Sequence, residues 1–388
     1  MGLNLFGMDV CLTKRCNLNC AHCGIGNIDC DSNKNNKNVE LSINELSSLI
    51  SQAAKEGIKH IIFSGGEPFL REDLFDILEM CEQREISFAI LSNGTLINDE
   101  VAQKLRRYKR LAYVRISLDY PTKAEMDAFR GMDGVFDAIK NAIDVLVHNN
   151  IICGIGMSIM QTNIDKVSDV AELALKYGAD FFRAVPIVSI GKSKDTVIDN
   201  TFYKRALNNV LKAHEIVNLD LGYATILLPK ELEKIANNLL VSCPGGERTI
   251  AIANDGTLLR CPLSGAAITD KTIKNTSLHE LAELNYAKMI KKEKIAVDLC
   301  CKNCYFLLKC SGGCMCELES RVCNGHEEQQ FCFKEILESV LSDRNAGKRR
   351  RNVINNIICR QNTQAKFNVP MCFRSSPIWW FPLKIRKR

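Results

Sequence analysis

Short apolar runs alternate with amphipathic stretches over the first half of this chain, and this alternation limits its fold more than any other feature. The apolar runs that favour strands lie at residues 8–12, 60–63, 88–91, 113–118, 154–159 and 181–185. Helical spacing of apolar residues lies between them, at 43–55, 74–83, 100–108, 136–148 and 165–177. Strands that alternate with helices form βαβ units and a parallel sheet. We therefore predict an α/β fold, either a partial (β/α)6 TIM-like barrel or a doubly wound sheet.

Polar or glycine-rich loops follow several of the predicted strands. They span residues 13–23, 64–68, 92–95 and 117–121. In parallel α/β folds the carboxyl ends of the strands form the active-site face. We therefore expect the candidate functional residues to lie together at one edge of the sheet.

The chain has 19 cysteines in 388 residues. The N-terminus has no basic segment followed by an apolar run, so we predict no signal peptide. No apolar stretch approaches the length of about 20 residues that spans a membrane. We expect a cytoplasmic protein without a membrane span. In such a protein clustered cysteines bind metal or take part in redox chemistry, whereas disulfides are rare.

Cys16, Cys20 and Cys23 follow the first predicted strand directly, with the spacing Cys-x3-Cys-x2-Cys. Three thiolates on one loop can bind three corners of an iron–sulfur cubane, which leaves one iron without a protein ligand. A four-cysteine zinc site needs a fourth thiolate. The nearby Cys11 lies inside the strand and Cys30 lies beyond a glycine-bearing loop. The spacing favours the cubane, and a zinc site is the alternative.

The cysteine triplet is joined by Gly65-Gly66-Glu67-Pro68 at the end of the second predicted strand. Together the two motifs resemble the radical S-adenosylmethionine (SAM) superfamily. The resemblance implies that the triplet holds a [4Fe–4S] cluster whose open iron binds SAM, and that the Gly-Gly-Glu segment contacts the amino group of SAM. Glycines let the backbone approach closely, and Glu67 can accept a hydrogen bond from an ammonium group.

The resemblance also implies the reaction. One electron from the reduced cluster cleaves SAM to methionine and a 5′-deoxyadenosyl radical, and the radical abstracts a substrate hydrogen. Further SAM contacts are implied for polar residues near the ends of the third to sixth predicted strands, where loop capping or solvent contact is the alternative role. These residues are Ser92, Asn93, Ser117, Asp119, Ser158 and Arg183.

A second group of cysteines lies in the C-terminal half, and its spacing resembles that of the SPASM domain, an auxiliary-cluster module of many radical SAM enzymes. The resemblance implies two further [4Fe–4S] clusters, and zinc ribbons are the alternative. The first auxiliary cluster would take Cys243, Cys261 and Cys314. The second would take Cys301, Cys304, Cys310 and Cys332. The fourth ligand of the first stays open between no residue and Cys300, Cys316 or Cys323.

These patterns predict four regions. They are a radical SAM partial barrel at 1–215, a helical linker at 216–240, a SPASM domain at 241–340 and a basic tail at 341–388. The formal charge of the chain is +6. Because the excess of Lys and Arg lies in the tail, the charge indicates nothing about the substrate of the main body. We expect a solvated tail and no nucleic-acid partner.

SPASM-bearing relatives mostly modify ribosomally made peptides or proteins, by thioether or carbon–carbon crosslinks, epimerisation or oxidation. The resemblance therefore implies a radical SAM oxidoreductase of the peptide-maturase type, with an external one-electron reductant of the flavodoxin or ferredoxin type. Pro262 stands where the sulfatase-maturase branch has an aspartate, which disfavours that branch. The first predicted strand begins at residue 8, so we expect any leader peptide to be recognised by a separate leader-peptide-binding protein or by another surface of the chain.

Two alternatives remain at this point. One is a radical SAM enzyme that acts on a small molecule, such as the oxidative decarboxylation of a haem precursor. The other belongs to a different class: a zinc-bound module that binds nucleic acid through the basic tail. The sequence does not identify a general acid or base.

Overall fold

The structure is a computed structural model, and it describes residues 5–24, 28–29, 40–187, 191–193, 196, 199–216, 220–221, 249–262, 267–296 and 383–384. The chain divides into two compact units. The first comprises Met1–Ile155, Val188–Thr196 and Pro244–Lys291. The second comprises Gly156–Ile187, Val197–Cys243 and Lys292–Arg388. The domain boundaries that we drew from the sequence stay predictions.

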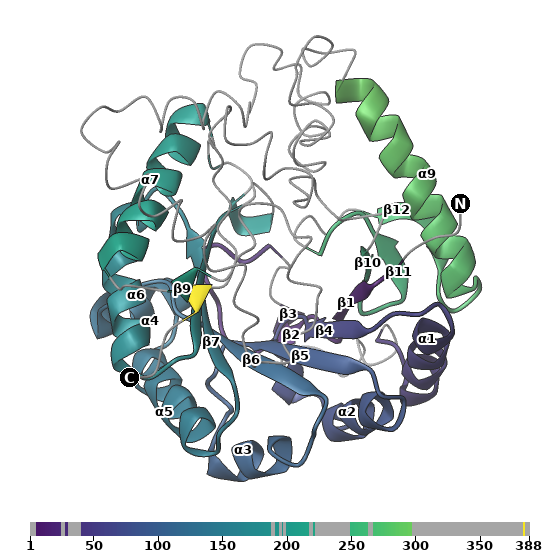
Figure 1. Cartoon of the computed structure of the whole chain (residues 1–388), viewed down its shortest axis with the longest axis horizontal. Helices are drawn as coiled ribbons and strands as arrows, with labels where there is room; N and C mark the ends of the chain where they lie inside the picture. Colours follow the sequence, from purple (N-terminus) through teal and green to yellow (C-terminus); the bar gives the residue numbers. More distant parts are fainter. Residues whose placement is uncertain are drawn as a thin grey trace. The chain divides into compact units, whose positions relative to one another are not determined.

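Four parallel strands form the centre of the first unit (Figure 1): β1 (Gly7–Cys11), β4 (His60–Ser64), β5 (Ser87–Ser92) and β6 (Leu111–Ser117). They lie side by side in chain order, and each is parallel to the next. Alternate side chains, among them Val10, Phe63 and Ile116, are fully buried. β-Branched and aromatic residues favour strands because they pack well on a pleated surface.

Helices follow these strands: α1 (Ile43–Lys55), α2 (Leu74–Gln83), α3 (Asp99–Leu105), α4 (Lys123–Arg130) and α5 (Val135–His148). Ser42 and Glu45 form a capping box at the start of α1, and the side chains of Asn98 and Thr122 cap α3 and α4. Such caps satisfy backbone N–H groups that have no partner inside the helix.

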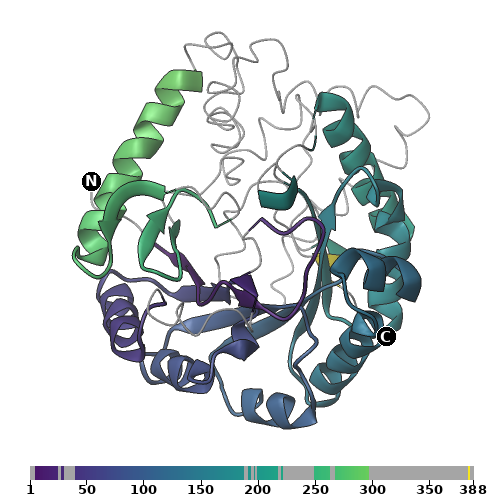
Figure 2. The same cartoon turned by 180° about the vertical axis from the view of Figure 1, so that it is seen from behind.

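The helices of the first unit lie along one side of its sheet (Figures 1 and 2). A doubly wound sheet has helices on both faces and reverses its strand order at a switch point. The sequential order β1, β4, β5, β6 therefore excludes that alternative for this unit. The predicted α/β fold with a parallel sheet is confirmed.

A later segment of the chain extends the same sheet on the other side of β1. β10 (Thr249–Ile252) pairs with β1 in parallel, and β11 (Thr257–Leu259) and β12 (Ala267–Thr272) follow as antiparallel strands. α9 (Leu278–Ala296) comes after them. The sequence patterns do not predict these strands. They make β1, which leads into the cysteine triplet, an inner strand of the sheet.

The second unit contains the end of β7 (Cys153–Ile159), which begins in the first unit, and β8 (Phe181–Pro186). The short strand β13 (Leu383–Lys384) pairs with β8 in antiparallel orientation, and β9 (Asp220–Leu221) pairs with β13. Its helices are η3 (Ile164–Lys166), α6 (Val167–Lys176) and α7 (Asn200–Ile216). Most of the predicted helical linker at 216–240 lies outside the described residues. Among those described, no helix is both long and apolar enough to cross a membrane.

Candidate functional site

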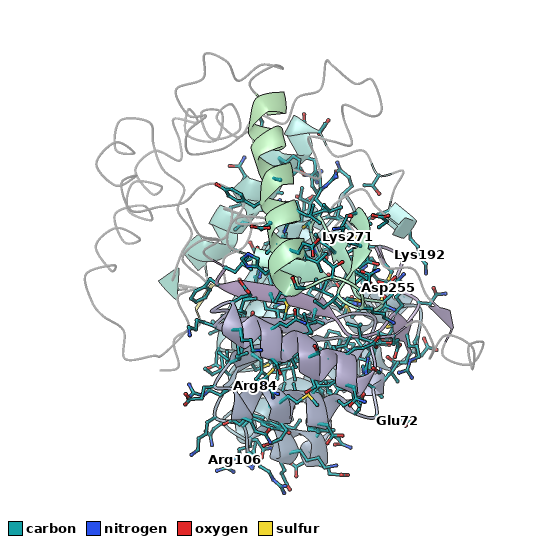
Figure 3. All side chains as sticks on the ribbon, turned by 90° about the vertical axis from the view of Figure 1, so that its right-hand side faces the viewer. Glu72, Arg84, Arg106, Lys192, Asp255 and Lys271 are labelled. Carbon is teal, nitrogen blue, oxygen red and sulfur yellow. The ribbon has the colours of Figure 1, made fainter. Side chains whose placement is uncertain are left out.

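The predicted site residues of the first unit lie near the carboxyl ends of its strands. Figure 3 shows this edge: Glu72 and Asp255, which follow β4 and β10, lie on the same side of the unit as Lys192. Arg84 and Arg106, at the C-caps of α2 and α3, lie on the opposite side. The carboxyl edge of a parallel sheet is where such folds bind ligands.

The cysteine triplet lies in the segment after β1: Cys16 ends the two-residue strand β2 (Arg15–Cys16), and Cys20 and Cys23 follow it in a loop. Cys20 is buried, Cys16 and Cys23 are half-buried, and all three are free thiols. Burial raises the pKa of Cys16 to about 11, because a thiolate is poorly solvated there. A cationic iron would reverse this preference, because metal binding deprotonates a thiol.

The donors of this loop suit an iron–sulfur cluster. A cluster binds thiolates at separate irons, so its ligands need not converge on one point. Within the described ranges, no group of three or more His, Cys, Asp or Glu side chains is arranged to hold a single metal ion. Three soft thiol donors on one loop, and a close glycine cradle beside them, fit the cluster.

Gly65 and Gly66 form that cradle. Gly66 N donates to Thr13 O at 2.7 Å, and Glu67 N donates to Arg15 O at 2.8 Å. A Cβ on Gly65 would lie 2.3 Å from Thr13 O, and one on Gly66 would lie 2.0 Å from Arg15 O. Gly65 also has a φ of 144°, which disfavours other residues. Only glycine lets the loop after β4 contact the cysteine loop this closely.

Replacing Gly66 by Ala is expected to lower the free energy of unfolding by about 3 kcal/mol, because the overlap forces the loops apart and breaks backbone hydrogen bonds. Urea unfolding measures this loss. Gly7→Ala is the matched control, since its new Cβ would meet atoms no closer than 3.4 Å. Equal stability of the two variants would show that the close approach is not required.

The Glu67 carboxylate links the loops after β4 and β5. It is fully buried, and it accepts from Ser92 Oγ at 2.8 Å, Asn93 N at 2.7 Å and Phe69 N at 3.3 Å. Burial raises the pKa of Glu67 to about 7, although these hydrogen bonds oppose the rise. Three of the predicted SAM contacts, Glu67, Ser92 and Asn93, are thus brought together, and the carboxylate is bound within the protein.

Asn93 connects this network to the cysteine loop. Its Nδ2 lies 3.8 Å from Cys16 Sγ and donates to Asn17 Oδ1 at 2.9 Å. Asn17 in turn donates to Thr95 Oγ1 at 2.8 Å. We did not predict Asn17 and Thr95 as site residues, although Asn17 lies inside the cysteine motif and Thr95 ends the polar loop after the third predicted strand.

Asp119, which follows β6, forms a buried ion pair with Arg130 at the end of α4. The other guanidinium nitrogen, Nη1, lies 3.4 Å from Cys20 Sγ. We predicted Asp119 as a site residue but missed Arg130. The sequence contains a signal for this helix. Thr122-x-x-Glu125 is a capping-box pattern and Gly131 is a typical residue after a helix end, so together they indicate a helix that ends at Arg130.

His22 lies against the same segment. Its ring stacks on Phe129 with centroids 4.7 Å apart, and burial lowers the pKa of His22 to about 4, so the ring is neutral near pH 7. Lys192 also contacts the cysteine loop: its N donates to Cys23 O at 3.1 Å, and its Nζ contacts Asn19 Oδ1 and Cys20 O. The loop is therefore held from several directions before any ligand binds.

The remaining predicted site residues are distributed as follows. Pro68 begins a short 3-10 helix after the glycine cradle, and Ser117 is the half-buried last residue of β6. Ser158 in β7 and Arg183 in β8 belong to the second unit, and their SAM contacts stay predictions. Cys261 is half-buried, forms no disulfide and lies shortly after β11. Nine other predicted cysteines lie outside the described residues, namely Cys243, Cys300, Cys301, Cys304, Cys310, Cys314, Cys316, Cys323 and Cys332.

The family model of the Radical SAM superfamily matches residues 10–174. This range contains the cysteine loop, the glycine cradle, the Glu67 network and Arg130. With the partial-barrel fold, the match shows that the chain contains a radical SAM domain. Such a domain implies a [4Fe–4S] cluster and SAM as cofactors.

Two curated relatives and one solved structure are similar to this chain over different shares of its length. Fe-coproporphyrin III synthase of Methanosarcina barkeri is 35% identical over 162 residues, which cover 42% of this chain and 39% of that protein. Mycofactocin maturase MftC of Mycolicibacterium smegmatis is 26% identical over 317 residues, 78% of this chain and 76% of that protein. SuiB of Streptococcus suis, bound to S-adenosylmethionine, has a similar fold: its TM-score is 0.65 at 19% identity, over 82% of this chain and 74% of SuiB.

The extent of these similarities differs between relatives. The chain spans 55% and 53% of two AdoMet-dependent heme synthases, about half of their length. The superfamily is therefore shared with relatives of more than one activity.

Proposed function

We propose that this chain binds SAM at a [4Fe–4S] cluster held by Cys16, Cys20 and Cys23, and that the resulting 5′-deoxyadenosyl radical abstracts a hydrogen from the substrate. The observation that supports this most is the pair of backbone bonds that join Gly66 and Glu67 to the residues just before the first thiol. When bound, the cluster supplies the electron that cleaves the sulfonium bond of SAM. The protein supplies orientation and keeps water away.

The chain's own residues prepare the cysteine loop for this role. Asn93 Nδ2 and Arg130 Nη1 face the sulfurs of Cys16 and Cys20. Hydrogen bonds to ligand atoms orient them and stabilise their negative charge. SAM would lie along the edge formed by the glycine cradle and the loops after β5 and β6. The residues that we propose to contact it are Gly65, Gly66, Glu67, Pro68, Ser92, Asn93, Ser117, Asp119, Ser158 and Arg183.

We propose a ribosomally made peptide or protein as the substrate. The similarity to Mycofactocin maturase MftC covers 78% of the chain, so it continues beyond the radical SAM match at 10–174 into the region of the second cysteine group. A further structure of SuiB, which shares the fold, holds the precursor peptide SuiA. The modification would be a crosslink, an epimerisation or an oxidation of a residue.

The second candidate substrate is a haem precursor. It is favoured by the higher identity of 35% to Fe-coproporphyrin III synthase. That similarity covers 42% of this chain, a share that the radical SAM domain alone can account for. Substrate choice depends on the surfaces outside the shared cofactor site. We therefore rank the peptide first.

For the C-terminal region we propose a SPASM domain with two auxiliary clusters. Cys261 is half-buried and forms no disulfide, which is compatible with a ligand role. The ligand sets are those implied by the cysteine spacing, and an external flavodoxin or ferredoxin would supply electrons in the cytoplasm. Three cubanes correspond to about twelve irons per chain. Iron and sulfide analysis after anaerobic purification measures this number, and zinc without sulfide would contradict the proposal.

The substrate classes can be separated directly. The reconstituted protein is incubated with SAM, dithionite and either a porphyrin precursor of haem that still carries its carboxylate side chains or, where a small open reading frame adjoins its gene, the peptide that this frame encodes. We expect the peptide to increase 5′-deoxyadenosine formation and to change in mass by loss of hydrogen. Loss of carbon dioxide from the porphyrin, with an unchanged peptide, would instead support the haem-precursor alternative. Reactions without dithionite give the background.

A further inference from the structure

The end of α4 lies directly on the cysteine loop. Asn19 N donates to Arg130 O at 3.2 Å, and Ala21 N donates to Phe129 O at 3.0 Å. The helix stops at Gly131, whose φ is 71° and whose missing Cβ would lie 3.0 Å from Asn19 O. Two backbone bonds on either side of Cys20 therefore fix the position of Arg130 relative to that thiol.

The Arg130 side chain lies between a carboxylate and a thiol. It is 5% exposed, with Nη2 paired to Asp119 Oδ2 and Nη1 at 3.4 Å from Cys20 Sγ. Its guanidinium carbon lies 5.7 Å from the centre of the Phe129 ring. The three charged or polarisable groups run in the order Asp119, Arg130, Cys20, so the positive end of the buried ion pair faces the sulfur.

We propose that Arg130 is a positioning residue that donates to the Cys20 thiolate and raises the reduction potential of the SAM-binding cluster, with Asp119 as the opposing charge. This inference rests on the proposed function, since it requires a cluster at Cys20. Reduction adds negative charge that the thiolates share. A buried positive donor stabilises the reduced form more than the oxidised form, and hydrogen bonds to sulfur are known to tune such potentials.

Replacing the two members of the ion pair should shift the reduction potential in opposite directions. Arg130→Gln removes the positive charge and leaves Asp119, so the potential should become more negative. Asp119→Asn removes the opposing charge and leaves the guanidinium on the sulfur, so the potential should become more positive. We expect each change to alter the reduction equilibrium about tenfold, which is 59 mV for a one-electron couple. A purely structural role would not give shifts of opposite sign.

The test is a redox titration of the full reconstituted chain. The titration is monitored through the electron paramagnetic resonance signal that changes when SAM is added. Lys123→Gln is the matched control, because Lys123 begins the same helix but forms an exposed ion pair with Asp137. Its potential should equal that of the unaltered chain. Shifts in the same direction for the two test variants, or none, would overturn the inference.

A double variant and the unaltered chain distinguish a failure of this inference from misfolding and from a failure of the proposed function. The double variant is needed because Arg130→Gln removes the ion-pair partner of the buried Asp119 carboxylate and can prevent folding. The double variant Asp119→Asn with Arg130→Gln removes both charges, and its potential should lie below that of Asp119→Asn; an equal potential counts against the inference. If the unaltered chain has no signal that responds to SAM, the proposed function itself fails. If that signal is present and the opposite shifts are absent, only the role of Arg130 fails.

Discussion

Replacing Cys16, Cys20 and Cys23 together by Ala is expected to abolish reductive cleavage of SAM. These thiols are the only cysteines that the described residues place on the loop after β1, beside the glycine cradle. Without them the SAM-binding cluster has no protein ligand, whereas ligands elsewhere in the chain are unchanged. We expect 5′-deoxyadenosine to fall to the level without enzyme, and the iron content to fall by about four per chain.

Cys81→Ala is the matched control for the triple variant. Cys81 is also a free thiol and fully buried, but it lies in α2, where it packs in the core. Its replacement should lower stability slightly through lost packing and leave SAM cleavage intact. Circular dichroism and urea unfolding show whether each variant is folded. Cleavage of SAM by a folded triple variant would contradict the assignment of the site.

The sequence predicts the parallel sheet well because its signal is local. Apolar runs such as those around Phe63 and Ile90 are buried, and the loops that follow them contain Gly66 and Asn93. Motif spacing predicts the cysteine loop for the same reason: the three proposed ligands of one site lie within eight residues of sequence. Both predictions need only the order of residues along the chain.

The sequence cannot predict which distant groups meet. Glu67 is read as a free acceptor for SAM, yet the register of β4 and β5 places Ser92 and Asn93 against its carboxylate. Likewise, β10 pairs with β1 although about 240 residues separate them, and parallel pairing leaves no short-range signal. Contacts of this kind arise from tertiary packing, so they appear only in the folded chain.

The stability of the cluster-free chain should fall between pH 4.5 and 7 because of Glu67. Burial raises the pKa of Glu67 from its ordinary value of 4.5 to about 7. In this window the folded chain keeps a proton that the unfolded chain has lost. The contribution of protonated Glu67 to the free energy of unfolding is therefore fully present below pH 4.5, and it is lost as the pH rises through 7. At about 1.4 kcal/mol for each pH unit, the loss is about 3 kcal/mol.

Glu67→Gln should remove this pH dependence, because an amide does not titrate and can still accept a hydrogen bond from Asn93 N. Urea unfolding of both proteins at several pH values measures the difference. The free energy of unfolding of the variant, minus that of the unaltered chain, should be about 3 kcal/mol larger at pH 8 than at pH 4.5. Glu79→Gln, in an exposed position on α2, should leave the pH dependence unchanged. A parallel pH dependence for Glu67→Gln and the unaltered chain would mean that Glu67 stays ionised on folding, held by its three hydrogen bonds rather than neutralised by burial.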